Sequence, residues 1–373
     1  MESMERVAKP SLGALTPTIS HSIGKFGTAC LRSLPPELSH HLGMQMLKRG
    51  VLKAFKPPID SNLDISMATD LEGVGELEHP IGLAAGFDKN AENLIGLGTM
   101  GFSFIEAGTV TPLPQSGNQK PRLFRQKEQF ALVNRMGFNN VGCEQFAHNF
   151  KAQTSKLSFP VGINVGKNKI TKLDQALSDY ISAIRSLEGL GKYFVVNISS
   201  PNTPGLRSLS SKDFIDELAT CIRSERADKI SDIWIKLDPD MQKSDFQKVV
   251  EAVSTQKFAG IVLTNTHRVE LPFSGGQSGH PLSVKSTQCL EWAYEVHKGN
   301  MPMIGCGGIL SGGDIFQKMI RGASAVQIYT ALIYRGPFVV YELLAELKAE
   351  LKLRKIRFLK DILGAYYEDS RLS

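Results

Sequence analysis

A repeated strand-then-helix pattern from Pro80 onward constrains the fold of this chain more than any other feature. Eight short apolar runs have the composition of buried strands, and stretches with helical spacing separate most of them. The strands are predicted at residues 80–86, 102–110, 159–165, 193–199, 232–238, 260–265, 301–306 and 325–330. Helices are predicted at 173–188, 211–226, 242–256, 284–298 and 312–321.

This alternation predicts an α/β protein built as a (β/α)₈ TIM barrel. An open, doubly wound sheet would show the same alternation, but a count of eight strands favours closure. In such a barrel the active site lies at the carboxyl ends of the strands, so polar residues at those ends are the candidates for chemistry.

The N-terminal region reads as a separate small unit. Residues 1–17 are expected to be disordered, and residues 18–56 to form two short amphipathic helices that meet at Pro35-Pro36. Such a hairpin is too small to bury both faces alone, so it must dock on the barrel, lie on a bilayer, or do both. Residues 57–373 are expected to form the catalytic barrel.

The charge distribution points to a membrane surface rather than to nucleic acid. The net charge is +6, and residues 1–56 supply +5 of it with eight basic and three acidic residues. The remainder is almost neutral, which argues against a broad nucleic-acid-binding face. A small basic module at the N-terminus fits an anionic membrane surface better.

The cysteines and the hydropathy exclude several classes of protein. Five scattered cysteines without a Cys-x-x-Cys pair predict a reduced compartment, with no disulfide framework and no metal site. No apolar run reaches the length of about 18 residues that a spanning helix needs. The first 17 residues lack the apolar core of a signal peptide.

The run from Tyr193 to Arg207 carries the densest set of polar groups. A β-branched and aromatic strand ends there in amides and hydroxyls within seven residues: Asn197, Ser199, Ser200, Asn202 and Thr203. A structural turn would use one or two such residues as caps, so a planar polar ligand is the better explanation. The alternative is an elaborate turn.

Other predicted strand ends and neighbouring loops add amides and one buried lysine. The amides of Asn134, Asn164 and Asn265 both donate and accept hydrogen bonds, which suits a heterocycle with imide and carboxylate groups. Lys236 lies in an apolar strand, and a buried lysine needs a partner. That partner is either an electron-rich cofactor or, in the structural alternative, Asp238 or Asp240.

The last two strands end in residues typical of a phosphate site. Gly307 and Gly308 follow the seventh strand, and Tyr329 and Thr330 end the eighth. Barrels often hold a phosphate at this place with backbone N–H groups.

Several motifs in order make the chain resemble the class 2, quinone-dependent dihydroorotate dehydrogenases over residues 36–365. They are Ala84-Ala-Gly-Phe-Asp-Lys89, Pro121-Arg-Leu-Phe-Arg125, Asn134-Arg-Met-Gly-Phe-Asn139, Gly162-Ile-Asn-Val-Gly-Lys-Asn-Lys169, Asn197-Ile-Ser-Ser-Pro-Asn-Thr203 and Ile304-Gly-Cys-Gly-Gly308. The resemblance implies an FMN-binding barrel that oxidises (S)-dihydroorotate to orotate in pyrimidine (UMP) biosynthesis and passes electrons to ubiquinone.

The resemblance also implies roles for single residues. Ser200 would be the general base that takes the proton from C5 of the substrate while the C6 hydride passes to FMN. Thr203 and a water near Phe138 would relay its proton. A cysteine, which deprotonates more easily, stands at the base position in the related class 1 enzymes.

The remaining implied residues fall into three groups. Substrate would contact Lys89, Asn134, Asn197, Asn202 and Asn265. FMN would contact Ala85, Gly86, Lys89, Thr109, Asn164, Asn197, Lys236, Thr264, Ser278, Gly279, Gly307, Gly308, Tyr329 and Thr330, with Lys236 stabilising negative charge on the flavin. The quinone site would include His40, Arg125 and Tyr329, although His40 has the alternative of being a solvated surface histidine.

Some residues depart from the family pattern. His267 stands where threonine is usual, Gln277 replaces leucine, Cys306 stands where valine is common and Asp238 where alanine is. None removes a named catalytic group, but together they affect the loop after the sixth strand.

Two other functions are compatible with such a barrel. One is a soluble class 1 type enzyme that uses fumarate or NAD, against which Ser200 and the basic hairpin argue. The other is an inactive barrel kept as a binding module. The expected protein is a monomer on the mitochondrial inner membrane or, alternatively, on the cytoplasmic face of a bacterial inner membrane.

Overall fold

Eight parallel strands form a closed barrel in the computed structural model, which describes residues 17–55, 67–71, 73–226, 229–270 and 272–367. Around the barrel the order is β3 (Ile81–Leu83), β4 (Phe104–Val110), β7 (Val161–Val165), β8 (Tyr193–Asn197), β9 (Ile233–Lys236), β10 (Gly260–Leu263), β13 (Met303–Cys306) and β14 (Ala325–Ile328). β14 pairs back to β3. The predicted TIM barrel is therefore confirmed, and the open sheet is excluded.

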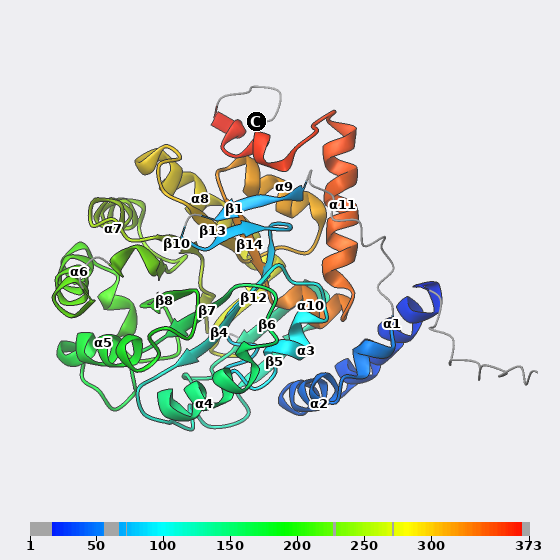
Figure 1. Cartoon of the computed structure of the whole chain (residues 1–373), viewed down its shortest axis with the longest axis horizontal. Helices are drawn as coiled ribbons and strands as arrows, with labels where there is room; N and C mark the ends of the chain where they lie inside the picture. Colours follow the sequence, from blue (N-terminus) through cyan, green and yellow to red (C-terminus); the bar gives the residue numbers. More distant parts are fainter. Residues whose placement is uncertain (1–16, 56–66, 72, 227–228, 271, 368–373) are drawn as a thin grey trace, which may run out of the picture.

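Helices surround the strands (Figure 1). They are α3 (Leu94–Gly98), α4 (Gly142–Thr154), α5 (Ala176–Ser186), α6 (Lys212–Arg226), α7 (Lys243–Thr255), α8 (Ser283–His297), α9 (Gly312–Ile320), α10 (Thr330–Arg335) and α11 (Val339–Leu353). Each buries an apolar stripe against the barrel; in α6 the stripe includes Phe214, Leu218 and Ile222, four residues apart. The five predicted helices are all present.

Aromatic rings fill the amino-terminal half of the barrel. Phe104, Tyr193 and Trp234 are fully buried in one inner cluster. Neighbouring strands carry glycines where a side chain would collide with these rings: Gly82, Gly162 and Gly260. A hairpin of β1 (Thr69–Leu71) and β2 (Gly75–Leu77) adds leucines to the same cluster. The interior is thereby packed at this end, and the cavity described below lies toward the carboxyl ends of the strands.

A four-stranded antiparallel sheet lies beside the barrel and was not predicted. Its order is β11 (His267–Val269), β12 (Gly275–Gly279), β6 (Ala131–Asn134) and β5 (Leu123–Gln126). β12 reads Gly-Gly-Gln-Ser-Gly and lacks the β-branched residues that mark strands. Pairing with β6, more than 130 residues earlier, makes it a strand.

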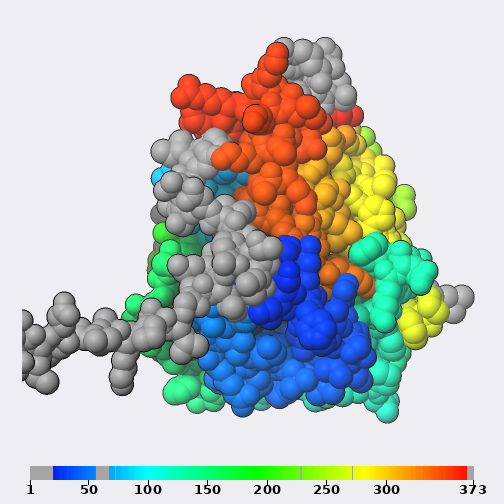
Figure 2. All heavy atoms as spheres, turned by 90° about the vertical axis from the view of Figure 1, so that its right-hand side faces the viewer, coloured from blue at the N-terminus to red at the C-terminus, as the bar shows by residue number. Residues whose placement is uncertain are grey.

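The N-terminal helices form a hairpin on one side of the barrel (Figure 2). α1 (Pro17–Ser33) and α2 (Pro36–Lys48) are followed by a short 3₁₀ turn, η1 (Val51–Ala54), and Pro36 occupies the start of α2 as predicted. Residues 1–16, expected to be disordered, lie outside the described residues, as does the expected domain boundary near residue 56. Among the described helices, none has the length and apolar character to cross a membrane.

Candidate active site

A cavity of about 1140 Å³ opens at the carboxyl ends of the strands. That volume includes the space open to solvent at the barrel mouth. The predicted site residues that line it are Ala85, Gly86, Lys89, Thr109, Asn134, Phe138, Asn197, Ser200, Asn202, Lys236, Thr264, Asn265, Ser278, Gly279, Gly307, Gly308, Tyr329 and Thr330.

The floor of this cavity is polar because of strand alternation. Glu106 and Lys236 follow the inward-facing Phe104 and Trp234 by two positions, so they point into the barrel one layer higher. Lys236 Nζ lies 3.8 Å from Glu106 Oε1, and their side chains are 6% and 0% exposed. Burial alone would lower the pKa of Lys236, but the Glu106 carboxylate outweighs it and raises that pKa. Lys236 is therefore a fixed positive charge.

The structural alternative, in which Asp238 or Asp240 is the partner of Lys236, is wrong. β9 ends at Lys236, and Asp238 and Asp240 lie beyond it, where both pair with Arg207. The partner, Glu106, comes instead from β4, which β7 and β8 separate from β9 in the barrel, and no local spacing reveals it.

The asparagines form two hydrogen-bonded groups in the cavity wall. Asn197 Nδ2 donates to Asn164 Oδ1 (3.2 Å), and Asn265 Nδ2 donates to Asn197 Oδ1 (3.1 Å). In the second group, Asn202 Nδ2 donates to Asn134 Oδ1 (3.0 Å). Asn164 is buried behind the wall and orients Asn197. The amides are therefore held in defined orientations before a ligand binds.

Ser200 lies in this wall, in the loop that follows β8. It is 5% exposed, and its Oγ accepts the N–H of Asn202 at 3.3 Å. Phe138 lines the same cavity, whereas Thr203 is buried and does not line it. The relay through Thr203 and Phe138 stays a prediction.

Lys89 adds a second positive charge near the rim of the cavity. Its Nζ donates to the Gly86 carbonyl at 2.6 Å. Burial, with Arg122 nearby, lowers its pKa to about 8, so it remains mostly protonated at neutral pH.

Small residues and hydroxyls form the end of the cavity near β13 and β14. The hydroxyls of Ser278 and Thr330 are 2.9 Å apart. Behind the loop, Lys318 Nζ donates to Ser286 Oγ (2.7 Å), which donates to the Gly307 carbonyl (2.8 Å). β12 thus brings Ser278 and Gly279 to the cavity despite the unusual sequence of the preceding loop.

A second, largely apolar cavity lies between the hairpin and the barrel. It has a volume of about 1180 Å³, including space open to solvent, and is lined by residues of α1 and α2, among them His40, together with Arg125 of β5. Both cavities are lined by Leu123, Leu132 and Tyr329, so they share a wall. Arg125 Nη1 donates to the carbonyl of Leu34 at 2.6 Å, which ties the hairpin to β5.

His40 is not a solvated surface residue, and that alternative is wrong. Its ring meets the edge of Phe87, with 5.0 Å between ring centroids, and Phe87 in turn contacts Tyr329. Burial, with the charge of Lys89, lowers the pKa of His40 to about 3, so the ring is neutral.

Two polar residues of the floor were not assigned a role from the sequence. Glu106 accepts hydrogen bonds from Asn164 Nδ2 and from Gln327 Nε2, both at 2.6 Å. Gln327 Oε1 has no partner among the described residues. A signal existed for both: each follows an inward-facing residue, Phe104 or Ala325, by two positions.

Comparisons with known proteins agree with this geometry. The family model described as dihydroorotate dehydrogenase matches residues 67–351. The dihydroorotate dehydrogenase (quinone) of Myxococcus xanthus is 38% identical, over 90% of this chain and 95% of the relative. The enzyme of the same name from Acinetobacter baumannii is 42% identical over 83% of this chain and 95% of its own. This chain belongs to the quinone-dependent dihydroorotate dehydrogenase family.

Solved structures support the same assignment. The ligand-free DHODH of Eimeria tenella superimposes with a TM-score of 0.81 at 33% identity, covering 89% of this chain and 99% of that one. The resemblance inferred from the motifs is confirmed. Like its relatives, the chain is an oxidoreductase of pyrimidine biosynthesis, which excludes the inactive barrel.

Proposed function

We propose that this chain oxidises (S)-dihydroorotate to orotate with Ser200 as the base, holds FMN in the cavity at the barrel mouth, and delivers the electrons to ubiquinone in the cavity beneath the hairpin. The observation that carries the proposal is the pair of adjoining cavities, which share Leu123, Leu132 and Tyr329. One contains the predicted base together with amides and two lysines; the other is largely apolar and suits an isoprenoid quinone.

The residues of the first cavity fit FMN. Gln327 Oε1 is a buried acceptor without a partner among the described residues, and Gln327 lines the cavity and contacts Glu106, as Lys236 does. The Gly307-Gly308 loop with Ser278 and Thr330 would take the phosphate, and Lys236 with Asn197 would hold the ring, while Asn164, predicted as an FMN contact, would orient Asn197 from behind the wall. FMN supplies the hydride acceptor and the electron carrier to the quinone.

The substrate would be held by the amides and by Lys89. Asn134, Asn202 and Asn265 present donors and acceptors that match an imide, and Lys89 supplies a cation for a carboxylate. With the substrate so placed, Ser200 would abstract the C5 proton. Its own proton must leave for the base to act, and Thr203 is the proposed next carrier.

The hairpin would place the quinone cavity against a bilayer. Large apolar side chains on α1 and α2 face solvent, including Phe26 at 72% exposed and Leu38 at 46%. We expect a monomer held peripherally on the mitochondrial inner membrane or, alternatively, on a bacterial inner membrane. Subcellular fractionation of the source cells tests the compartment.

The test measures the two half-reactions separately by stopped flow. Ser200→Ala should keep FMN bound while flavin reduction by dihydroorotate slows roughly 100- to 10,000-fold, the usual contribution of a positioned base. Reoxidation by a ubiquinone analogue should be unchanged. Ser208→Ala, an exposed hydroxyl in the same loop region, is the matched control. An undiminished reduction rate in Ser200→Ala would remove Ser200 as the base.

A further inference from the structure

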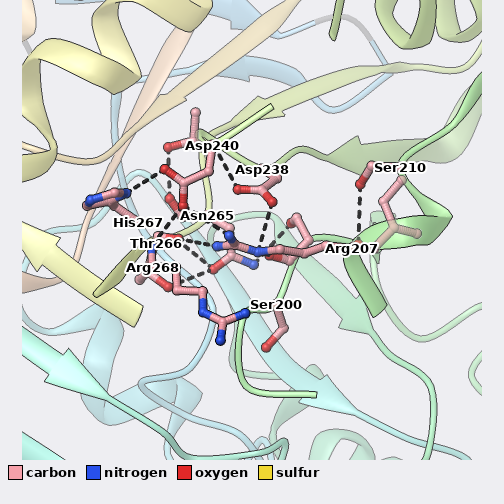
Figure 3. Close-up of polar contacts among 12 residues, drawn as sticks. Ser200, Arg207, Ser210, Asp238, Asp240, Asn265, Thr266, His267 and Arg268 are labelled. Carbon is pink, nitrogen blue, oxygen red and sulfur yellow. Dashed lines mark hydrogen bonds and ion pairs between the residues drawn. The ribbon is translucent and has the colours of Figure 1, made fainter. Parts of the chain in front are cut away.

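A charged network lies behind the loop that carries Ser200 (Figure 3). It comes from four parts of the chain: Arg207 near the end of the loop after β8, Asp238 and Asp240 after β9, His267 at the start of β11, and Lys285 on α8. None of these side chains lines the cavity at the barrel mouth. The network therefore does not bind the substrate directly.

The Arg207 guanidinium lies at the centre of this network. Its Nε lies 2.8 Å from Asp238 Oδ2, and its Nη1 lies 3.0 Å from Asp240 Oδ2. The same group donates to two backbone carbonyls, from Nη2 to Thr266 at 3.0 Å and from Nε to Ser199 at 3.4 Å. One planar cation thus joins three segments.

Those two carbonyls belong to neighbours of predicted substrate residues. Ser199 precedes Ser200, and Thr266 follows Asn265. The side chains of this region are also joined, because Asn265 Nδ2 donates to Ser199 Oγ at 3.1 Å. Arg207 therefore fixes the distance between the base and an amide on the neighbouring side of the cavity.

The aspartates hold the guanidinium in one orientation. Asp240 accepts from His267 Nδ1 (2.5 Å), from Lys285 Nζ (2.7 Å) and from the backbone N–H of Arg268 (2.8 Å). Its own N–H donates to Asp238 Oδ1 at 2.9 Å. With so many partners, neither carboxylate can rotate freely, so the position of Arg207 is set before substrate binds.

The charges of the network balance in spite of partial burial. Two carboxylates face Arg207 and Lys285, and the side chains range from 5% exposed at Asp238 to 42% at Lys285. Burial raises the pKa of Asp238 to about 6, against the opposing effect of Arg207. Burial acts on Asp240 in the same direction, but its hydrogen bonds hold that pKa well below the usual range.

We infer that Arg207 is a positioning residue for proton abstraction: by tying Ser199 and Thr266 to the Asp238–Asp240 pair, it holds Ser200 and Asn265 in register with the substrate. The inference rests on the proposed role of Ser200. A displacement of about 1 Å at a reacting group costs on the order of 100-fold in rate. Arg207 therefore governs C5–H cleavage but not FMN binding or quinone reduction.

The experiment uses the FMN-loaded enzyme and Arg207→Ala. Flavin reduction at saturating dihydroorotate should slow roughly 10- to 100-fold, and the kinetic isotope effect with C5-deuterated substrate should increase. FMN content and quinone reoxidation should stay unchanged. Ethylguanidinium should restore part of the reduction rate, whereas ethylammonium, which lacks the planar fork, should restore little.

Two further variants make the result decisive. Arg268→Met removes an exposed side chain that pairs with Glu270 and enters the network only through its backbone, so its reduction rate should equal that of the wild type. Asp238→Asn keeps Arg207 but weakens one of its contacts, so the rate of flavin reduction should fall less than in Arg207→Ala. This variant replaces Arg207→Ala as the test if Arg207→Ala does not fold.

The outcomes separate this inference from the proposed function. If flavin reduction is slow in Ser200→Ala but its rate and the C5 isotope effect are normal in Arg207→Ala, the positioning role of Arg207 is overturned. The assignment of Ser200 as the base then stands. If Arg207→Ala lowers the unfolding midpoint but leaves the rate of flavin reduction unchanged, the network has only a structural role. Normal reduction in Ser200→Ala would instead overturn the base assignment.

Discussion

Lys236 shows how one residue acquires its properties from a distant partner. In the strand sequence Ile-Trp-Ile-Lys it is a lysine in an apolar segment, which is unfavourable by itself. Glu106, 130 residues earlier, supplies the counter-charge, and Asn164 and Gln327 satisfy the carboxylate. A buried pair of this kind contributes little net stability, but breaking it by removing one partner is costly.

Single and double substitutions of this pair should therefore be strongly non-additive. Lys236→Met or Glu106→Gln should each lower the free energy of unfolding of the apoprotein by about 3–5 kcal/mol, because each leaves its partner buried and unpaired. The double variant should lose less than the sum of the two. Urea unfolding measures all three, and Lys212→Met, which breaks an exposed pair on α6, should shift the midpoint little. Additive losses would contradict the pairing.

His79 illustrates how an element is anchored. Just before β3, its Nε2 bonds to the carbonyl of Gly101 at 2.9 Å, and its Nδ1 accepts the N–H of Ile81 at 3.2 Å. Only the neutral ring with the proton on Nε2 satisfies both contacts. Burial accordingly lowers the pKa of His79 to about 4, and the ring ties the start of β3 to the segment that enters β4.

Acid should weaken this anchor. The folded pKa lies below the unfolded value near 6.5, so the unfolded state binds the proton first and stability falls as pH drops from 6.5 toward 4. Through His79 alone, the free energy of unfolding should fall by about 2 kcal/mol when the pH is lowered from 7 to 5. His79→Gln should be less stable at pH 7 but should lose less on acidification, as measured by urea unfolding at both pH values. His148→Gln, the same substitution at an exposed position outside this anchor, is the control.

The hairpin is an element whose apolar surface has two sides. Ile23 and Met46 line the second cavity and are also partly exposed, whereas Phe26, Leu38 and Leu42 are exposed without lining it. Such a patch on a basic segment is what a bilayer surface would cover.

Polar substitutions on that patch should release the enzyme from lipid. Phe26→Ser with Leu38→Ser should weaken binding to anionic vesicles roughly ten-fold or more, because each side chain buried in lipid contributes about 1.5–3 kcal/mol. Flavin reduction should be unaffected. Ile170→Ser, an 80% exposed residue outside the hairpin, is the control. Co-sedimentation with vesicles measures the binding. Equal binding by the double variant and by the Ile170→Ser control would refute a membrane role for the hairpin.

At the scale of the whole molecule, the cavity connects parts of the barrel that are far apart in the sequence. Its lining includes residues at or just beyond the ends of β3, β4, β8, β9, β10, β13 and β14. A ligand bound there contacts nearly the whole circumference. Because FMN would bind only the folded barrel, its binding energy adds to the stability of the whole fold.

Removal of FMN should therefore lower the unfolding temperature of the whole barrel in one transition. At about 1,000 times its dissociation constant, FMN should add about 4 kcal/mol to the free energy of unfolding. Riboflavin, which lacks the phosphate, should add clearly less at the same concentration. Thermal unfolding followed by tryptophan fluorescence tests both, and equal stabilisation would exclude a phosphate site at Gly307-Gly308.

The sequence by itself determined the barrel and most of the groups at its mouth. The strands, the helices and the polar strand ends are visible in local spacing. Asn197 and Ser200 stand out in the polar cluster that ends an apolar strand, and Lys236 stands out because it interrupts an apolar run. The motifs added the family and the predicted roles of residues such as Gly307 and Tyr329.

Only the tertiary structure decided which of these groups meet. Glu106 pairs with Lys236, β12 joins β6, and Arg207 joins the loops after β8, β9 and β10, all across large separations in the chain. The physical reason is that closure of the barrel brings the ends of distant strands close together in space. The hydrophobic periodicity of the sequence indicates only which face of a strand or helix a residue occupies. The shared wall of the two cavities likewise exists only once the hairpin has docked.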